Sequence, residues 1–164
     1  MDQFDPTIDA AFLEYADLEL RCHRLLSAGK DDSVEMADAE DRMEKLWAKL
    51  DEVQKRSLRG MASDLGWVRV KGTSPPKGRK TPDEISQTER QELATARGRK
   101  DWHRLLHFLR LCAPDFSTVA LARERGLAYR AIGFSEYAKV FDAQATEFAG
   151  ALASSVEMPL SVKA

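Results

Sequence analysis

Apolar residues recur every three or four positions along most of this chain, which is the spacing of amphipathic α-helices. The alternation of polar and apolar residues typical of a strand occurs only briefly, over residues 67–70. We therefore predict an all-α fold of about six or seven helices, arranged as antiparallel hairpins or as a helical bundle. The expected helices cover about residues 6–28, 33 onwards, 52–65, 82–97, 99–112, 117–131 and 135 onwards.

Capping residues mark the expected helix starts. Asp5 precedes Pro6, and this pair favours a helix start because the carboxylate can accept from free amides while proline has no amide to lose. Thr81 and Glu84 have the spacing of a capping box. Asp51 and Gln54 could form a second box that opens a separate helix near residue 52, or the preceding helix could simply continue.

Glycine and proline mark the expected helix ends. Gly29, Gly66 and Gly133 each follow an apolar-periodic segment, where a helix commonly stops. Pro159 lies beyond the last expected helix, and we expect no regular helix around it because proline lacks the amide hydrogen that a helix interior uses.

A polar, basic segment divides the chain. We assign residues 1–68 to an N-terminal helical hairpin region, 69–81 to a basic Pro/Gly linker, 82–154 to C-terminal hairpins and 155–164 to a tail. Lys71, Lys77, Arg79 and Lys80 of the linker could bind phosphate or an acidic partner. A solvated linker is the simpler interpretation, because no aromatic residue is interleaved for base stacking.

The second expected helix has a narrow apolar stripe of the kind that lies along one neighbouring helix. Its members alternate strictly at three and four: Met36, Ala39, Met43, Leu46, Leu50 and Val53. The stripe is short for a coiled coil, so we favour packing against the first helix of the same chain over self-association.

Residues 126–145 carry the most specific pattern. Gly126 and Tyr129 lie on one expected helix, a glycine follows at the turn, and Ala138, Phe141 and Ala145 lie on the next helix. This arrangement of small and aromatic residues resembles one tetratricopeptide (TPR) repeat. Arg125 departs from it, because the family prefers a large aliphatic residue before this glycine, and the terminal proline of the pattern is absent.

The resemblance covers roughly residues 82–150 and is weaker outside residues 126–145. At a shift of 33 residues, Arg97 aligns with Arg130 and Phe108 with Phe141; Leu105 and Cys112 fall on Ala138 and Ala145. Because TPR domains bind proteins or extended peptides along the first helices of their hairpins, the resemblance implies a non-catalytic adaptor or scaffold. Its candidate contacts are Arg90, Arg97, Arg123 and Arg130, which would suit an acidic partner.

The charge distribution leaves two other functions open. The net charge is −2, but residues 1–60 hold 15 acidic and 9 basic residues, whereas residues 61–110 hold 6 and 11. A nucleic-acid-associated accessory protein could use the basic linker, and a structural protein could self-associate through its first two helices, so monomer and homodimer both stay open.

No arrangement of residues suggests catalysis, a cofactor or a metal. Phosphate-loop, nucleophile-elbow and kinase motifs are missing from the sequence. His103 and His107 are four residues apart, but nearby arginines make a solvated basic face the better interpretation. Cys22 and Cys112 have the setting of reduced core thiols. With no leader and no long apolar run, we expect a soluble cytoplasmic protein that is not an enzyme.

Overall fold

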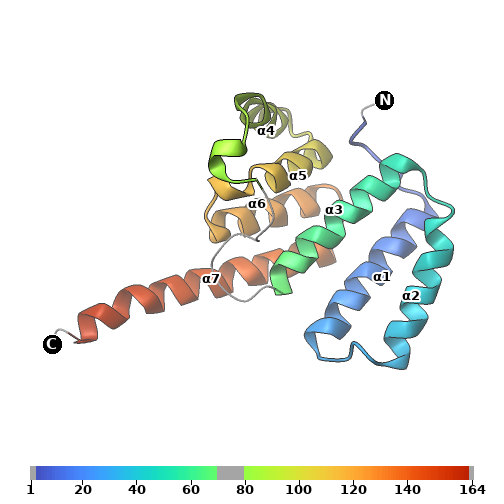
Figure 1. Ribbon diagram of the computed structural model, residues 1–164, viewed down its shortest axis with the longest axis horizontal. Coiled ribbons are helices and arrows are strands. Elements are labelled where there is room, and N and C mark those ends of the chain that lie inside the picture. Colours follow the sequence, from blue (N-terminus) through green and yellow to red (C-terminus); the bar gives the residue numbers. More distant parts are fainter. Residues whose placement is uncertain (1–2, 70–79, 163–164) are drawn as a thin grey trace. The chain divides into compact units, whose positions relative to one another are not determined.

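The computed structural model describes residues 3–69 and 80–162, with side chains as far as residue 153. Within these ranges the chain forms seven α-helices, two short 3-10 helices and no strand, which confirms the all-α prediction (Figure 1). The helices are α1 (Ala10–Ser27), α2 (Val34–Trp47), α3 (Glu52–Arg69), η1 (Pro82–Glu84), α4 (Gln87–Arg99), α5 (Trp102–Leu111), η2 (Ala113–Asp115), α6 (Thr118–Ala131) and α7 (Ser135–Val162). They belong to two compact units, Met1–Val70 and Lys71–Ala164.

The first unit is built around α1, which contacts both α2 and α3. Helices α1 and α2 run side by side as the predicted antiparallel hairpin (Figure 1). The stripe on α2 packs inside this unit, since Leu46 is only 2% exposed. The apolar core consists of Phe12, Ala16, Leu20, Met36, Ala39, Leu46, Leu50, Leu58, Met61 and Leu65.

Local capping explains where two helices of this unit begin. The Ser33 hydroxyl accepts from the Met36 amide at 3.2 Å, as expected for the start of α2. Asp51 and Gln54 form a reciprocal capping box, with side-chain to backbone distances of 2.8 and 2.9 Å. Helix α3 is therefore separate from α2, which settles the alternative left open by the sequence.

The predicted start of the first helix was wrong. Asp9, not Asp5, caps α1, and its carboxylate accepts from the Phe12 amide at 2.9 Å. That hydrogen bond lowers the pKa of Asp9 below its ordinary value. The segment before Asp9 is held outside the helix because the Gln54 side-chain amide donates to the Thr7 carbonyl at 2.8 Å.

Two predicted helix ends were also wrong. Helix α3 continues through Gly66 to Arg69, whose guanidinium lies 3.1 Å from His23 Nδ1 on α1. Helix α7 continues through Pro159 to Val162. Gly29 and Gly133 do follow α1 and α6 as predicted, with φ of 72° and 93°, a conformation that side chains with a Cβ rarely adopt.

The second unit consists of two consecutive helical hairpins, α4/α5 and α6/α7, with α5 in contact with both α4 and α6. Thr81 and Glu84 form the predicted capping box, but it opens only the single turn η1, and Ser86 caps α4. Helix α5 starts later than predicted, because Lys100 takes a left-handed conformation (φ 56°) that ends α4. Cys112, which directly follows α5, is fully buried, whereas Cys22 of the first unit is half-buried. Neither cysteine forms a disulfide.

Aromatic rings hold α6 against α7. Tyr129 stacks on Tyr137 and Phe141, with ring centroids 5.3 and 5.1 Å apart and interplanar angles of 20° and 13°. Tyr129 and Phe141 are fully buried. This packing fixes the face of α6 that turns away from α7.

Helices α6 and α7 come close together at Gly126, one helical turn before Tyr129. A Cβ at Gly126 would overlap a carboxylate oxygen of Asp142 and stand 3.6 Å from the Ala138 carbonyl oxygen. The preceding residue, Arg125, is only 1% exposed and has its guanidinium carbon 6.0 Å from the centroid of the Phe141 ring. Arginine thus occupies a core position between the two helices.

Candidate functional site

The two hairpins place equivalent residues in equivalent surroundings. At the shift of 33, Leu105 and Ala138 are both buried, as are Ala96 and Tyr129. The pairs Phe108 with Phe141 and Cys112 with Ala145 are buried as well. The shift of 33 therefore pairs buried residues of the first hairpin with buried residues of the second. Helices α4 and α6 are the corresponding first helices of the two hairpins.

The same shift relates the four candidate arginines. It takes Arg90 to Arg123 and Arg97 to Arg130, and the residue between them is Ala94 on α4 and Leu127 on α6. On α6 the spacing of four and three residues puts Arg123, Leu127 and Arg130 on one face. All three are exposed, and Leu127 is 56% exposed. We call these three residues the α6 strip.

Arg97 links the two hairpins. One nitrogen of its guanidinium lies 2.7 and 2.8 Å from the two carboxylate oxygens of Glu124 on α6. Its guanidinium carbon is 5.9 Å from the centroid of the Phe116 ring. The Arg97 side chain is still 46% exposed, so the pair lies at the surface, where one ion pair contributes about 0.2 to 1 kcal/mol.

Arg130 forms its ion pair within its own hairpin. It donates to a carboxylate oxygen of Asp142 on α7, and both side chains are about half exposed. The other oxygen of Asp142 lies against the open face of Gly126. The close approach of the helices therefore positions the acid that binds Arg130.

Arg90 has the most fixed position of the four. Its guanidinium contacts both carboxylate oxygens of Asp115, at 2.8 and 3.1 Å, and donates to the carbonyls of Ile85 and Pro82 at 3.2 and 2.8 Å. The Arg90 hydrogen bonds hold the pKa of Asp115 below its ordinary value. Arg90 joins η1, α4 and η2, so most of its donors are already used inside the unit.

Arg123 differs from the other three because it has no ion pair with any residue that the structure describes. It lies one turn before Leu127 on α6. The α6 strip therefore combines Arg123, which has no ion pair within the described residues, the exposed apolar side chain of Leu127, and Arg130, which is paired with Asp142.

Neither these acids nor the exposure of Leu127 was predicted from the sequence. Glu124 lies 27 residues from Arg97 and Asp115 lies 25 residues from Arg90, so each pair forms only when the hairpins fold. Asp142 is 12 residues from Arg130. The exposure of Leu127 could have been recognised from the shift of 33, which aligns it with a position between two surface arginines.

Of the four basic linker residues, Lys71, Lys77 and Arg79 lie outside the described part of the chain. Lys80 forms an ion pair with Glu89 at the start of α4, and this hydrogen bond lowers the pKa of Glu89. The predicted linker contacts with phosphate or an acidic partner stay predictions.

His103 and His107 lie four residues apart on α5. Among the described residues, no three His, Cys, Asp or Glu side chains gather as a metal site would require. Arg104, on the same helix, binds Glu92 of α4 at 2.6 and 3.0 Å.

In comparisons with known proteins, the chain matches no protein-family model, no curated protein and no solved structure. The resemblance to TPR repeats therefore stays a prediction from residues 126–145. Within the described part of the chain, every helix is too short or too polar to cross a bilayer.

Proposed function

We propose that this protein is a non-catalytic adaptor that binds an acidic segment of another protein along α4 and α6. The observation that carries the proposal is the α6 strip, in which exposed Leu127 lies between Arg123 and Arg130. Arginine suits this role because its planar guanidinium binds carboxylates through two parallel hydrogen bonds. An exposed leucine between two such groups would receive an apolar side chain of the same ligand.

Helix α4 supports the proposal by extending the surface. Arg97 is held at the junction of the hairpins by Glu124, and its side chain is 46% exposed, so it stays within reach of a ligand. Arg90 is fixed by Asp115 and two carbonyls, so we assign it to positioning the start of α4. The contact set is therefore Arg97, Arg123, Leu127 and Arg130.

The test is an affinity capture from lysate of the native organism, followed by mass spectrometry. Wild type is compared with Arg97→Gln/Arg123→Gln. A matched control, Arg99→Gln/Lys139→Gln, removes two other exposed positive charges from the same unit. Helicity of both variants should equal that of wild type, because the exposed Arg97 pair contributes at most about 1 kcal/mol.

We expect proteins that are captured by wild type and the control to be lost from the Arg97→Gln/Arg123→Gln variant. Equal capture by all three proteins would refute the proposed surface. Nuclease treatment tests whether nucleic acid mediates the capture. Capture that depends on nucleic acid would disappear after the treatment, which would favour binding through the basic linker instead.

A further inference from the structure

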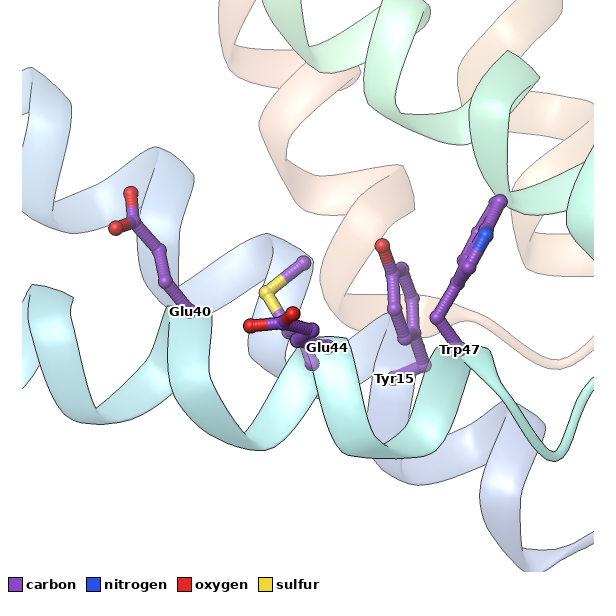
Figure 2. Close-up of a pocket in the computed structure, with 5 residues that line it drawn as sticks. Tyr15, Glu40, Glu44 and Trp47 are labelled. Atoms are coloured by element: carbon purple, nitrogen blue, oxygen red, sulfur yellow. The ribbon is translucent and has the colours of Figure 1, made fainter.

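The first unit contains an open pocket of about 370 Å³ between α1 and α2. It is lined by Tyr15 of α1 and by Glu40, Met43, Glu44 and Trp47 of α2. Figure 2 shows the Tyr15 and Trp47 rings standing next to each other, with Glu44 and then Glu40 on the preceding turns of α2. The lining thus combines aromatic rings, a thioether and two carboxylates.

The two rings form one aromatic wall. Their centroids are 5.3 Å apart at an interplanar angle of 42°. Trp47 already accepts cations from α3, because the guanidinium carbon of Arg59 is 5.1 Å and the Lys55 nitrogen 5.6 Å from its ring centroid. These cations occupy the Trp47 end of the wall, so a further cation has its best position near Tyr15.

Negative charge dominates the Tyr15 end. Glu40 and Glu44 are exposed on α2, and the buried Glu19 lies one turn from Tyr15 on α1. Burial and the Glu19 charge raise the pKa of Tyr15, while Arg59 opposes this shift. Burial and the charges of Glu40 and Glu19 raise the pKa of the neighbouring Cys22 thiol. Burial is the larger cause of both shifts, and the glutamate charges, which add to it, are the part that favours an incoming positive charge.

The residues that line the pocket favour a lysine side chain over a trimethylated lysine. Tyr15 and Met43 can cover an alkyl stem, and the two carboxylates can accept hydrogen bonds from an ammonium group at its end. A lysine side chain has both parts. A trimethylated lysine keeps the charge but has no N–H group to donate.

We propose that this pocket is a docking site for an unmodified lysine side chain of a partner protein. The aliphatic stem lies against Tyr15 and Met43, and the ammonium lies between the Tyr15 ring and the carboxylates of Glu40 and Glu44. This site is on the first unit and is independent of the acidic-segment surface proposed for the second unit.

The experiment titrates the full chain with a blocked pentapeptide that carries one central lysine between glycines. Proton–nitrogen NMR spectra follow the indole N–H of Trp47 and the amides of residues 40–47. Matched peptides replace the lysine with norleucine or trimethyl-lysine. The variants are Glu40→Gln/Glu44→Gln and the control Glu35→Gln/Asp38→Asn, which makes the same charge change elsewhere on α2.

We expect the lysine peptide to bind more tightly than both matched peptides. Neutralising Glu40 and Glu44 should weaken its binding by roughly fivefold, as expected for two surface ion pairs, and the control should have wild-type affinity. Equal shifts from the norleucine peptide would overturn the proposal in favour of an apolar groove. Tighter binding of trimethyl-lysine, unaffected by the Glu→Gln changes, would overturn it in favour of an aromatic cage.

Discussion

The close approach at Gly126 allows a quantitative test of how α6 and α7 fit together. A methyl group at this position would overlap a carboxylate oxygen of Asp142, but it would stand 3.4 Å from the Asp142 Cγ and 3.6 Å from the Ala138 carbonyl oxygen. The obstacle is therefore the end of a half-exposed side chain rather than the backbone of α7. Asp142 can rotate away at the cost of its ion pair with Arg130.

The expected free energies nearly cancel. Replacing glycine by alanine inside a helix stabilises it by about 0.5 to 1 kcal/mol. Loss of the exposed Arg130 pair costs about 0.2 to 1 kcal/mol. Gly126→Ala should thus change the stability of the second unit by less than about 1 kcal/mol in either direction. In an Asp142→Ala background, where no carboxylate stands in the way, the same change should stabilise by about 0.5 to 1 kcal/mol.

Native-state hydrogen exchange of the α6 and α7 amides is the suitable assay, because it reports on this unit separately from the first. The four proteins of the cycle are wild type, each single variant and the double variant. A loss of more than 2 kcal/mol for Gly126→Ala in both backgrounds would show that the helix backbones, not Asp142, limit the approach. Identical effects in both backgrounds would show that Asp142 plays no part.

Two further predictions concern the first unit. Leu46→Ala should destabilise this unit by about 2 to 5 kcal/mol, because Leu46 is a core residue that is only 2% exposed. Val34→Ala, at a 74% exposed position, should change the stability little, and urea unfolding followed by circular dichroism measures both variants. His23 is 6% exposed, and burial together with Arg69 and Arg24 lowers its pKa below 6.5. As the pH falls, His23 is therefore protonated in the unfolded chain at a higher pH than in the folded chain. The stability of the unit should then decrease as the pH falls below about 6.5. The urea midpoint of His23→Gln should lose this part of the pH dependence, and an unchanged profile would rule out His23 as its source.

Helix starts could be predicted where the signal is local. Ser33 caps α2, and the Asp51/Gln54 box opens α3, because each cap needs only residues within one turn. The Asp5 prediction failed because a distant side chain, Gln54, holds the preceding segment through the Thr7 carbonyl. Gly66 failed as a helix end, and the last turn of α3 instead places Arg69 against His23.

The candidate site could be predicted only in part. The TPR resemblance named the four arginines, and the shift of 33 paired Arg97 with Arg130, because both depend on spacing along the chain. The partners of Arg90 and Arg97 are residues 25 and 27 positions away, and no spacing rule identifies an acid at that distance. The pocket between Tyr15 and Trp47 was missed for the same reason, because its walls come from two helices.

The ion pair between Arg97 and Glu124 already offsets part of the positive charge at that position. Both carboxylate oxygens of Glu124 lie against one nitrogen of the guanidinium, so a ligand carboxylate at Arg97 would share the cation with an acid of the protein and gain less than at a lone arginine. A featureless polyanion would gain little from such a shared cation. Discrimination at this surface would then depend on ligands whose apolar side chain also covers Leu127.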